Sequence, residues 1–252
     1  VGSEMCIRDS YTGSLDSIGA IPSYDAMRTV VTVLASGNPS INEKLVSGPY
    51  EVGGIAPMGA AYLFVKDRTI DTVGELSGKS IAVLEYDSAQ ASMASRVGMS
   101  PVMSDITNFS GRFNNGSVDI CFAPIAAYSA LELYKGMQPD GGMIDYVLGQ
   151  LTAQVILKKD KFPDGYADKS RKYMLGQFDR AMTVIENANN EVDKKWWIRI
   201  PEADKLRYDE MMREARIALT KDGVYSKEMM SLLRKVRCKE EPSRAECVNP
   251  VE

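Results

Sequence analysis

The chain has 252 residues, of which 44% are hydrophobic and 25% are charged, with 20 glycines and 11 prolines. This composition is ordinary for a packed globular protein of one large or two modest domains, and it excludes a disordered, collagen-like or coiled-coil chain. The sequence contains no histidine, which excludes a histidine-based catalytic triad, a histidine-ligated metal and a histidine pH switch. The net charge of −4 argues against a nucleic-acid binder.

Charge is distributed unevenly along the chain. Residues 1–157 carry 9 lysines and arginines against 16 acidic residues, whereas residues 158–252 carry 21 against 18. The charges in the second part alternate in sign along helical segments, which indicates solvated helix faces rather than a nucleic-acid patch. The longest apolar stretch, residues 55–65, is interrupted by Pro57 and Gly59 and is too short to span a bilayer.

The first ten residues, Val-Gly-Ser-Glu-Met-Cys-Ile-Arg-Asp-Ser, do not have the pattern of a domain start. They lack the apolar core of a signal peptide and resemble a translated sequencing adapter. We therefore treat residues 1–10 as an artefact. We expect that the natural chain begins upstream and that the N-terminal part of its first lobe is missing.

The predicted elements alternate between strands and helices up to residue 157. A helical or turn segment and then a helix or buried strand occupy residues 15–37, where periodicity does not decide between helix and strand. The further strands are expected at 53–65, 80–85, 101–104, 118–123 and 152–157, with helices at 89–97 and 107–115. Strands that alternate with helices of about ten residues favour a parallel, doubly wound sheet.

The rest of the chain is expected to be wholly helical. Apolar residues at helical spacing predict one helix over residues 166–189, and a second over residues 203–220 that begins after Pro201. Ser226 is expected to cap a last helix.

Ligands of doubly wound sheets bind beyond the carboxyl ends of the strands, next to helix N-termini. That position is occupied in this sequence by Tyr86, Asp87, Gln90, Asn108, Phe109, Pro124 and Tyr128. Asp87 and the tyrosines have a simpler alternative: Asp87 would also serve as a helix N-cap, and the tyrosines would also serve as packed core residues with a bonded hydroxyl.

The cysteines bear on the compartment of the protein. Cys238 and Cys247 are nine positions apart in a polar tail with Pro242 between them, so they could close a loop whose disulfide contributes about 2–3 kcal/mol. A disulfide implies an oxidising compartment such as a periplasm; the alternative is two unrelated thiols in a reducing cytosol. Cys121 lies in an apolar strand and is expected to be an inert core residue, and the two tail cysteines lack further ligands for zinc.

Several short motifs follow one another in a recognisable order. Leu-Ser-Gly-Lys-Ser-Ile-Ala-Val occupies residues 76–83, Arg-Val-Gly-Met-Ser-Pro-Val residues 96–102, and Phe-Asn-Asn-Gly-Ser-Val-Asp residues 113–119, before Ala123 and Pro124. This order resembles the second lobe of the DctP-type solute-binding receptors of TRAP transporters. The chain is similar in particular to their AdeT-type branch, through residues 19–24, 48–50, 201–205 and 211–216 and the C-terminal cysteine pair.

The resemblance implies an α/β, two-lobed periplasmic-binding-protein-like fold of type II, the Venus-flytrap fold. Lobe one would comprise residues 11–67 and 150–252 and lobe two residues 68–149. The implied function is that of a periplasmic protein without catalytic activity or cofactor. It would capture a small organic solute between the lobes and deliver it to the membrane subunits of a TRAP transporter, with no nucleic-acid partner.

One departure from the family pattern concerns the ligand. DctP-type receptors usually carry, directly after Lys-Ile, an arginine that pairs with a ligand carboxylate; here that position is Ala82. Loss of a guanidinium removes the strongest anchor for a carboxylate. Either the ligand is not a simple dicarboxylate or sugar acid, or it is held differently, and a more apolar or aromatic pocket is one option. The candidate ligand-binding residues are Ser23, Tyr24, Tyr62, Tyr86, Asp87, Gln90, Asn108, Phe109, Arg112 and Tyr128.

Two other functions remain open at this point. An enzyme on the same architecture would need a nucleophile or paired carboxylates, and the pair Glu85 and Asp87 is more simply a strand end and a helix cap. An accessory protein of an efflux system is the other alternative, which the AdeT-type resemblance suggests.

Overall fold

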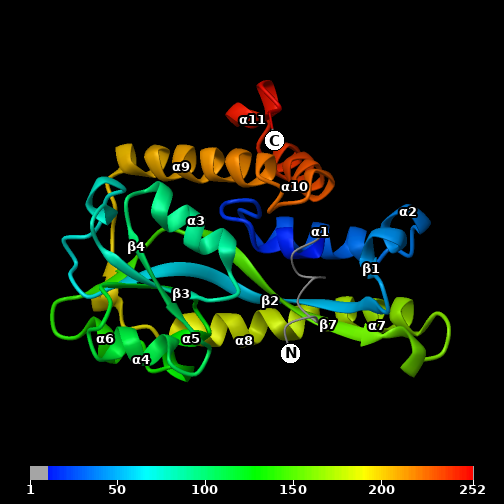
Figure 1. Cartoon of the computed structure of the whole chain (residues 1–252), viewed down its shortest axis with the longest axis horizontal. Coiled ribbons are helices and arrows are strands. Elements are labelled where there is room, and N and C mark those ends of the chain that lie inside the picture. Colours follow the sequence, from blue (N-terminus) through cyan, green and yellow to red (C-terminus); the bar gives the residue numbers. More distant parts are fainter. Residues whose placement is uncertain (1–10, 252) are drawn as a thin grey trace. The chain divides into compact units, whose positions relative to one another are not determined.

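The computed structural model of the protein describes residues 11–251, which form two compact units (Figure 1). Unit 1 contains the described residues up to Met58, together with Gly149–Val184 and the residues from Arg216 onward. Unit 2 contains Gly59–Leu148 and Ile185–Ala215. The prediction that residues 1–10 are an artefact lies outside the described residues.

The sheet of unit 2 has the strand order β4-β3-β5-β2-β6-β8. Its strands are β2 (Tyr50–Val65, which begins in unit 1), β3 (Ser80–Leu84), β4 (Ser100–Ser104), β5 (Ile120–Pro124), β6 (Gly142–Ile144) and β8 (Trp197–Ile198). β3 pairs in parallel with β4 and β5, as the alternating pattern predicts. β2 runs antiparallel to β5 and β6, so the sheet is mixed rather than wholly parallel.

The helices of unit 2 connect these strands and cover them. They are η4 (Gly74–Leu76), α3 (Ser88–Arg96), α4 (Phe109–Asn114), α5 (Ala127–Ala130), α6 (Tyr134–Met137), η6 (Lys194–Trp196) and the larger part of α9 (Glu202–Lys221). The α3 helix stops at Gly98, whose φ of +78° is a conformation that glycine adopts without strain. Close approach of backbones explains a second glycine: a Cβ on Gly141 would lie 2.2 Å from the carbonyl oxygen of Val65.

A side-chain clamp fixes β3 to β5. Asp119 Oδ2 accepts hydrogen bonds from the backbone N–H of Ser80 at 2.8 Å and from its hydroxyl at 2.7 Å, and Ser80 Oγ accepts from the Asp119 N–H at 3.0 Å. Both residues belong to the short motifs of the sequence. The motifs therefore encode the register of two neighbouring strands.

Unit 1 combines a small set of paired strands with helices. Its elements are η2 (Thr12–Asp16), α1 (Tyr24–Leu34), α2 (Pro39–Asn42), η3 (Glu43–Leu45), β1 (Val46–Ser47), the start of β2, β7 (Gly149–Lys158), η5 (Lys159–Lys161), α7 (Tyr166–Gly176), the start of α8 (Phe178–Asn190), the end of α9, α10 (Lys227–Glu240) and α11 (Ala245–Val248). β1 pairs antiparallel with β2, and β7 also pairs with β2. The ambiguous N-terminal segment is the helix α1.

Two predictions about the C-terminal half are wrong. The helix predicted over residues 166–189 is divided into α7 and α8 at Gln177, directly after Gly176, where glycine weakens the helix. The expectation of a wholly helical remainder fails at β8, which pairs with β6 through Met143 and Trp197. Through this pairing, residues 185–215 belong to unit 2, whereas the prediction assigned them to lobe one.

Buried charge stabilises the C-terminal end of unit 1. Glu246 on α11 accepts a hydrogen bond from Arg237 Nε at 3.0 Å and lies 3.9 Å from Arg216, and all three side chains are at most 6% exposed. The guanidiniums of Arg237 and Arg216 also donate to the carbonyls of Ala20, at 2.8 Å, and Ile18, at 3.0 Å. Glu246 therefore neutralises two arginines that hold the segment leading into α1.

The disulfide Cys238–Cys247 joins α10 to α11 next to this carboxylate. We expect the double variant Cys238→Ser/Cys247→Ser to lose about 2–3 kcal/mol of unfolding free energy, because its unfolded chain is less constrained and α11 is no longer tied to α10. Denaturant unfolding with and without a reductant measures the loss. The reductant should lower the stability of the parent chain and leave the double variant unchanged; equal stability of both oxidised proteins would contradict the prediction.

The ion pairs of Glu246 also predict a dependence of stability on pH. Burial alone would raise the pKa of Glu246, but its backbone hydrogen bond, Arg237 and Arg216 together hold the pKa below the ordinary 4.5. A lowered folded-state pKa stabilises the protein above pH 4.5, and this contribution is lost as the pH falls below that value. Glu246→Gln should therefore cost about 3–5 kcal/mol at pH 7, since it leaves buried cations without a counter-charge.

The measurement is denaturant unfolding of both proteins from pH 7 to pH 3. The difference in unfolding free energy should shrink toward the acid end, where the glutamate of the parent chain becomes protonated. A difference that stays constant across this range would show that the charge of Glu246 does not stabilise the fold.

No helix within residues 11–251 has the length and hydropathy needed to cross a membrane.

Candidate functional site

The candidate site lies at one edge of the unit 2 sheet. Because β3, β4 and β5 are parallel, their carboxyl ends meet at the same edge. The segments that follow them begin at Glu85, Asp105 and Ile125. β2 contributes Tyr62 to this edge, because it runs antiparallel to β5 with Ala61 opposite Pro124. The structure thus brings Tyr62, Tyr86, Asp87, Asn108 and Tyr128 to a common edge of unit 2.

Asp87 caps the helix α3. Its Oδ1 accepts a hydrogen bond from the backbone N–H of Gln90 at 2.9 Å, which is the usual N-cap interaction. Tyr86 is half-buried in the turn before the helix, and Gln90 is buried within its first turns. The capping role of Asp87 is therefore confirmed, and contact of these three residues with a ligand stays a prediction.

Asp105 organises the neighbouring turn, and the sequence reasoning did not identify it. Its carboxylate accepts hydrogen bonds from the backbone N–H groups of Thr107 at 2.7 Å and Asn108 at 3.0 Å, and from the Asn108 side-chain amide at 2.6 Å. The hydrogen bonds from Thr107 and Asn108, with the charge of Arg112, lower the pKa of Asp105. The signal in the sequence was Asp-Ile-Thr-Asn directly after a strand, a pattern typical of an Asx turn.

The side chains of Asn108 and Arg112 are partly committed to this turn. Asn108 Oδ1 accepts a hydrogen bond from Arg112 Nε at 3.4 Å, so the guanidinium of Arg112 lies beside the asparagine at the start of α4. Both residues are half-buried. Phe109 is 5% exposed and packs in the core of unit 2.

Two of the candidate tyrosines are buried against other aromatic rings. Tyr62 contacts Trp197 edge to face with ring centroids 5.3 Å apart, and Tyr128 contacts Tyr134 at 5.7 Å. Burial, and next the charge of Asp193, raises the pKa of Tyr128. Trp197 belongs to β8 and was missed, because the tandem tryptophans stand in a stretch that was expected to be helical.

The remaining candidates, Ser23 and Tyr24, belong to unit 1. The Ser23 hydroxyl accepts from the Ala26 N–H at 2.9 Å as the N-cap of α1 and donates to Glu240 at 3.0 Å. Tyr24 is the first residue of that helix and is half-buried. The structure therefore gives Ser23 a capping role.

Ala82, at the position of the usual arginine, is completely buried. It lies in the middle of β3, between Val102 of β4 and Cys121 of β5. Burial raises the pKa of the Cys121 thiol far above its ordinary value, so this thiol is not a nucleophile. Within residues 11–251 no group of three acidic or cysteine side chains is placed to hold a metal ion.

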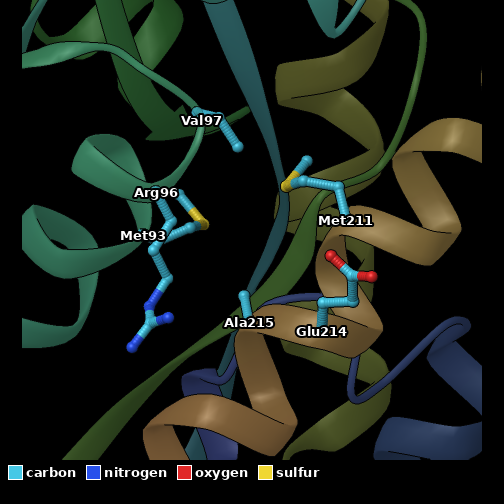
Figure 2. Close-up of a pocket in the computed structure, with 6 residues that line it drawn as sticks. All are labelled: Met93, Arg96, Val97, Met211, Glu214 and Ala215. Carbon is cyan, nitrogen blue, oxygen red and sulfur yellow. The ribbon is translucent and has the colours of Figure 1, made fainter.

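A separate cavity of about 220 Å³ lies between α3 and α9 in unit 2. Met93 and Arg96 of α3, with Val97 directly after the helix, line one wall, and Met211, Glu214 and Ala215 of α9 line the other (Figure 2). The cavity adjoins the C-terminal half of α3, whereas Asp87 and Gln90 lie in its N-terminal half. None of the predicted site residues lines this cavity.

Solved structures share the fold of this chain. This fold is similar to that of a TRAP periplasmic solute-binding protein from Desulfovibrio salexigens with bound orotic acid, with a TM-score of 0.76 and 16% identity over 93% of this chain and 77% of that chain. A TRAP periplasmic solute-binding protein from Desulfovibrio desulfuricans with bound sn-glycerol-3-phosphate gives a TM-score of 0.71 and 14% identity over 96% and 78%. The predicted two-lobed α/β fold is thereby confirmed.

The family follows from the sequence comparison. The family model "Solute-binding protein AdeT 1/2" matches residues 5–251. "Probable solute-binding protein AdeT1" of Acinetobacter baumannii is 43% identical over 239 residues, which are 95% of this chain and 78% of that protein. The chain belongs to the AdeT 1/2 family of solute-binding proteins. This confirms the resemblance inferred from the sequence and the main function predicted from it, solute binding.

The environment of Ala82 allows a direct test of the missing arginine. We expect Ala82→Arg to lower the unfolding free energy by about 3 kcal/mol or more, because the guanidinium enters a packed interior. Denaturant unfolding measures this, with Ala91→Arg on the half-buried surface of α3 as the control. A stable Ala82→Arg protein that gains affinity for carboxylates would show instead that position 82 faces a ligand.

Proposed function

We propose that the protein is a periplasmic receptor that binds a small organic solute at the carboxyl edge of the unit 2 strands and delivers it to the membrane subunits of a transporter. The observation that carries the proposal is the convergence of Tyr62, Tyr86, Asp87, Asn108 and Tyr128 on that edge, in a chain of a solute-binding family.

The chemistry of the residues supports binding rather than catalysis. The sequence has no histidine, Cys121 is buried with a raised pKa, and the carboxylates of Asp87 and Asp105 accept backbone hydrogen bonds. A nucleophile or general base needs a group that is free to exchange a proton with a substrate. The side chains of Asp87 and Asp105 instead stabilise a helix end and a turn.

The edge also suggests the character of the solute. The two structural neighbours are described with the anions orotic acid and sn-glycerol-3-phosphate, whereas the present chain has Ala82 in place of the usual arginine and several aromatic side chains at the same edge. Aromatic rings recognise flat or cationic groups through their faces and edges. We propose a solute whose binding does not depend on a single carboxylate. Arg112, which donates a hydrogen bond to Asn108, is the cation among the candidate residues.

The disulfide Cys238–Cys247 supports an extracytoplasmic location, since disulfides persist mainly in oxidising compartments. The structural neighbours are also described as periplasmic. Delivery to a membrane transporter follows from the same class of proteins and is proposed for this chain on that basis.

Thermal denaturation in the presence of organic acids, amines and aromatic compounds tests solute binding. A ligand at about 100 times its Kd should add about 2.7 kcal/mol of stability and raise the Tm by roughly 5–10 °C. Stabilisation by at least one compound supports the proposal. A panel in which no compound changes the Tm would contradict it.

The substitution Asp87→Asn separates capping from solute contact. Asparagine caps helices as well as aspartate does, so the stability should change by less than about 0.5 kcal/mol, while the affinity for the compound found in the screen should change about tenfold or more if the charge contacts it. Asp67→Asn is the matched control. Asp67 follows the C-terminal end of β2, and its carboxylate accepts a hydrogen bond from the Thr69 N–H at 2.9 Å. Equal affinity of both variants would exclude Asp87 from the site.

A further inference from the structure

An exposed surface of unit 1 combines aromatic side chains with lysines. It extends from the end of β7 through η5 and the following loop into α7 (Figure 1). We call it the lysine–tyrosine surface, and its members are Lys158, Lys159, Lys161, Phe162, Tyr166, Lys169, Lys172 and Tyr173, all of which are exposed. The stretch 158–166 has nine consecutive exposed residues.

The aromatic residues of this surface are not packed into the core. Phe162 and Tyr166 are 38% and 40% exposed and stack on each other with ring centroids 4.7 Å apart, and Tyr173 is 66% exposed. Tyr166, Lys169 and Tyr173 are separated by three and four positions, which places them on one face of α7. The opposite face of the helix carries the buried residues Ala167 and Arg171.

The charge of the lysine–tyrosine surface is positive although the whole chain has a net charge of −4. Asp168 is paired with the buried Arg171, and Asp160 lies 3.6 Å from Lys161 and 4.0 Å from Lys158. Asp164 is the third acidic residue of the stretch, so five lysines and Arg171 stand against three aspartates in residues 158–173. All five lysines are exposed, as are the three aromatic residues of the same stretch.

The type of cation distinguishes between two occupants of such a surface. Protein interfaces favour arginine and are depleted in lysine, and the one arginine between residues 158 and 173 points inward. Lysines beside tyrosine and phenylalanine are typical of surfaces that lie on a bilayer, where the rings sit at the headgroups and the ammonium groups attract anionic lipids. We propose that the lysine–tyrosine surface binds reversibly to the surface of an anionic phospholipid bilayer.

The proposal depends on the proposed function for its setting, since a receptor that serves a membrane transporter works next to a bilayer. Its mechanism needs no solute. Contact through one helix face and one loop would be weak and sensitive to salt, so that the receptor would stay close to the membrane and still exchange between sites on it.

The test is co-sedimentation of the full chain with vesicles of phosphatidylglycerol and phosphatidylcholine, and with vesicles of phosphatidylcholine alone. We expect binding to the anionic vesicles at low salt, loss of binding at high salt and little binding to the neutral vesicles. The triple variant Lys158→Glu/Lys159→Glu/Lys161→Glu should bind the anionic vesicles with an affinity lower by a factor of at least about ten. Phe162→Ser/Tyr166→Ser should also weaken binding, because the rings no longer enter the headgroup region.

The matched control is Lys194→Glu/Lys227→Glu/Lys235→Glu, which makes the same change of charge at exposed lysines elsewhere and should bind the anionic vesicles more strongly than the first triple variant. Equal loss in both triple variants would reduce the effect to net charge and overturn the proposal. So would an absence of binding by the parent chain, or binding to soluble polyglutamate but not to vesicles, which would indicate an acidic protein partner. Vesicle binding without any solute in the thermal screen would leave this proposal standing and contradict the proposed function.

Discussion

The antiparallel pairing of β2 with β5 determines which residues can meet at the candidate site. β3, β4 and β5 run in one direction, so the turns that follow them share an edge, and β2 enters at that same edge because it runs the other way. Tyr62 thereby joins residues that follow it by 24 to 66 positions in the sequence. The Ser80–Asp119 clamp fixes the register of β3 and β5 on which this convergence depends.

The elements of the parallel part of the sheet were predictable because their apolar runs and stop signals are local. Ile81, Ala82 and Val83 form a strand that is buried on both faces, which reads as a continuous apolar segment. β8 was missed because two residues carry no period, and Trp197 and Ile198 become a strand only by pairing with β6. The break at Gln177 was missed because apolar positions continue at helical spacing on both sides of it.

The candidate residues were predictable as a group and not in their roles. The residue types that cap helices are also those that bind solutes, so Asp87 and Ser23 satisfy both patterns, and only their hydrogen bonds show the capping role. Asp105 was missed because its importance arises from four donors in one turn. Glu246 stood in a polar tail, and nothing near it in the sequence shows that Arg216 and Arg237 remove it from solvent.

The ion pairs of Glu246 with Arg216 and Arg237 make substitutions at these three positions depend on one another. The three side chains come from three helices, α9, α10 and α11, yet they form one charge unit within the interior of unit 1. Truncation of Glu246 leaves two buried guanidiniums without a counter-charge, and truncation of Arg237 removes the hydrogen-bonded partner of the carboxylate. Removing one partner of a buried ion pair is strongly destabilising. Homologous chains should therefore retain all three or replace them together by uncharged residues, so that these positions evolve as one.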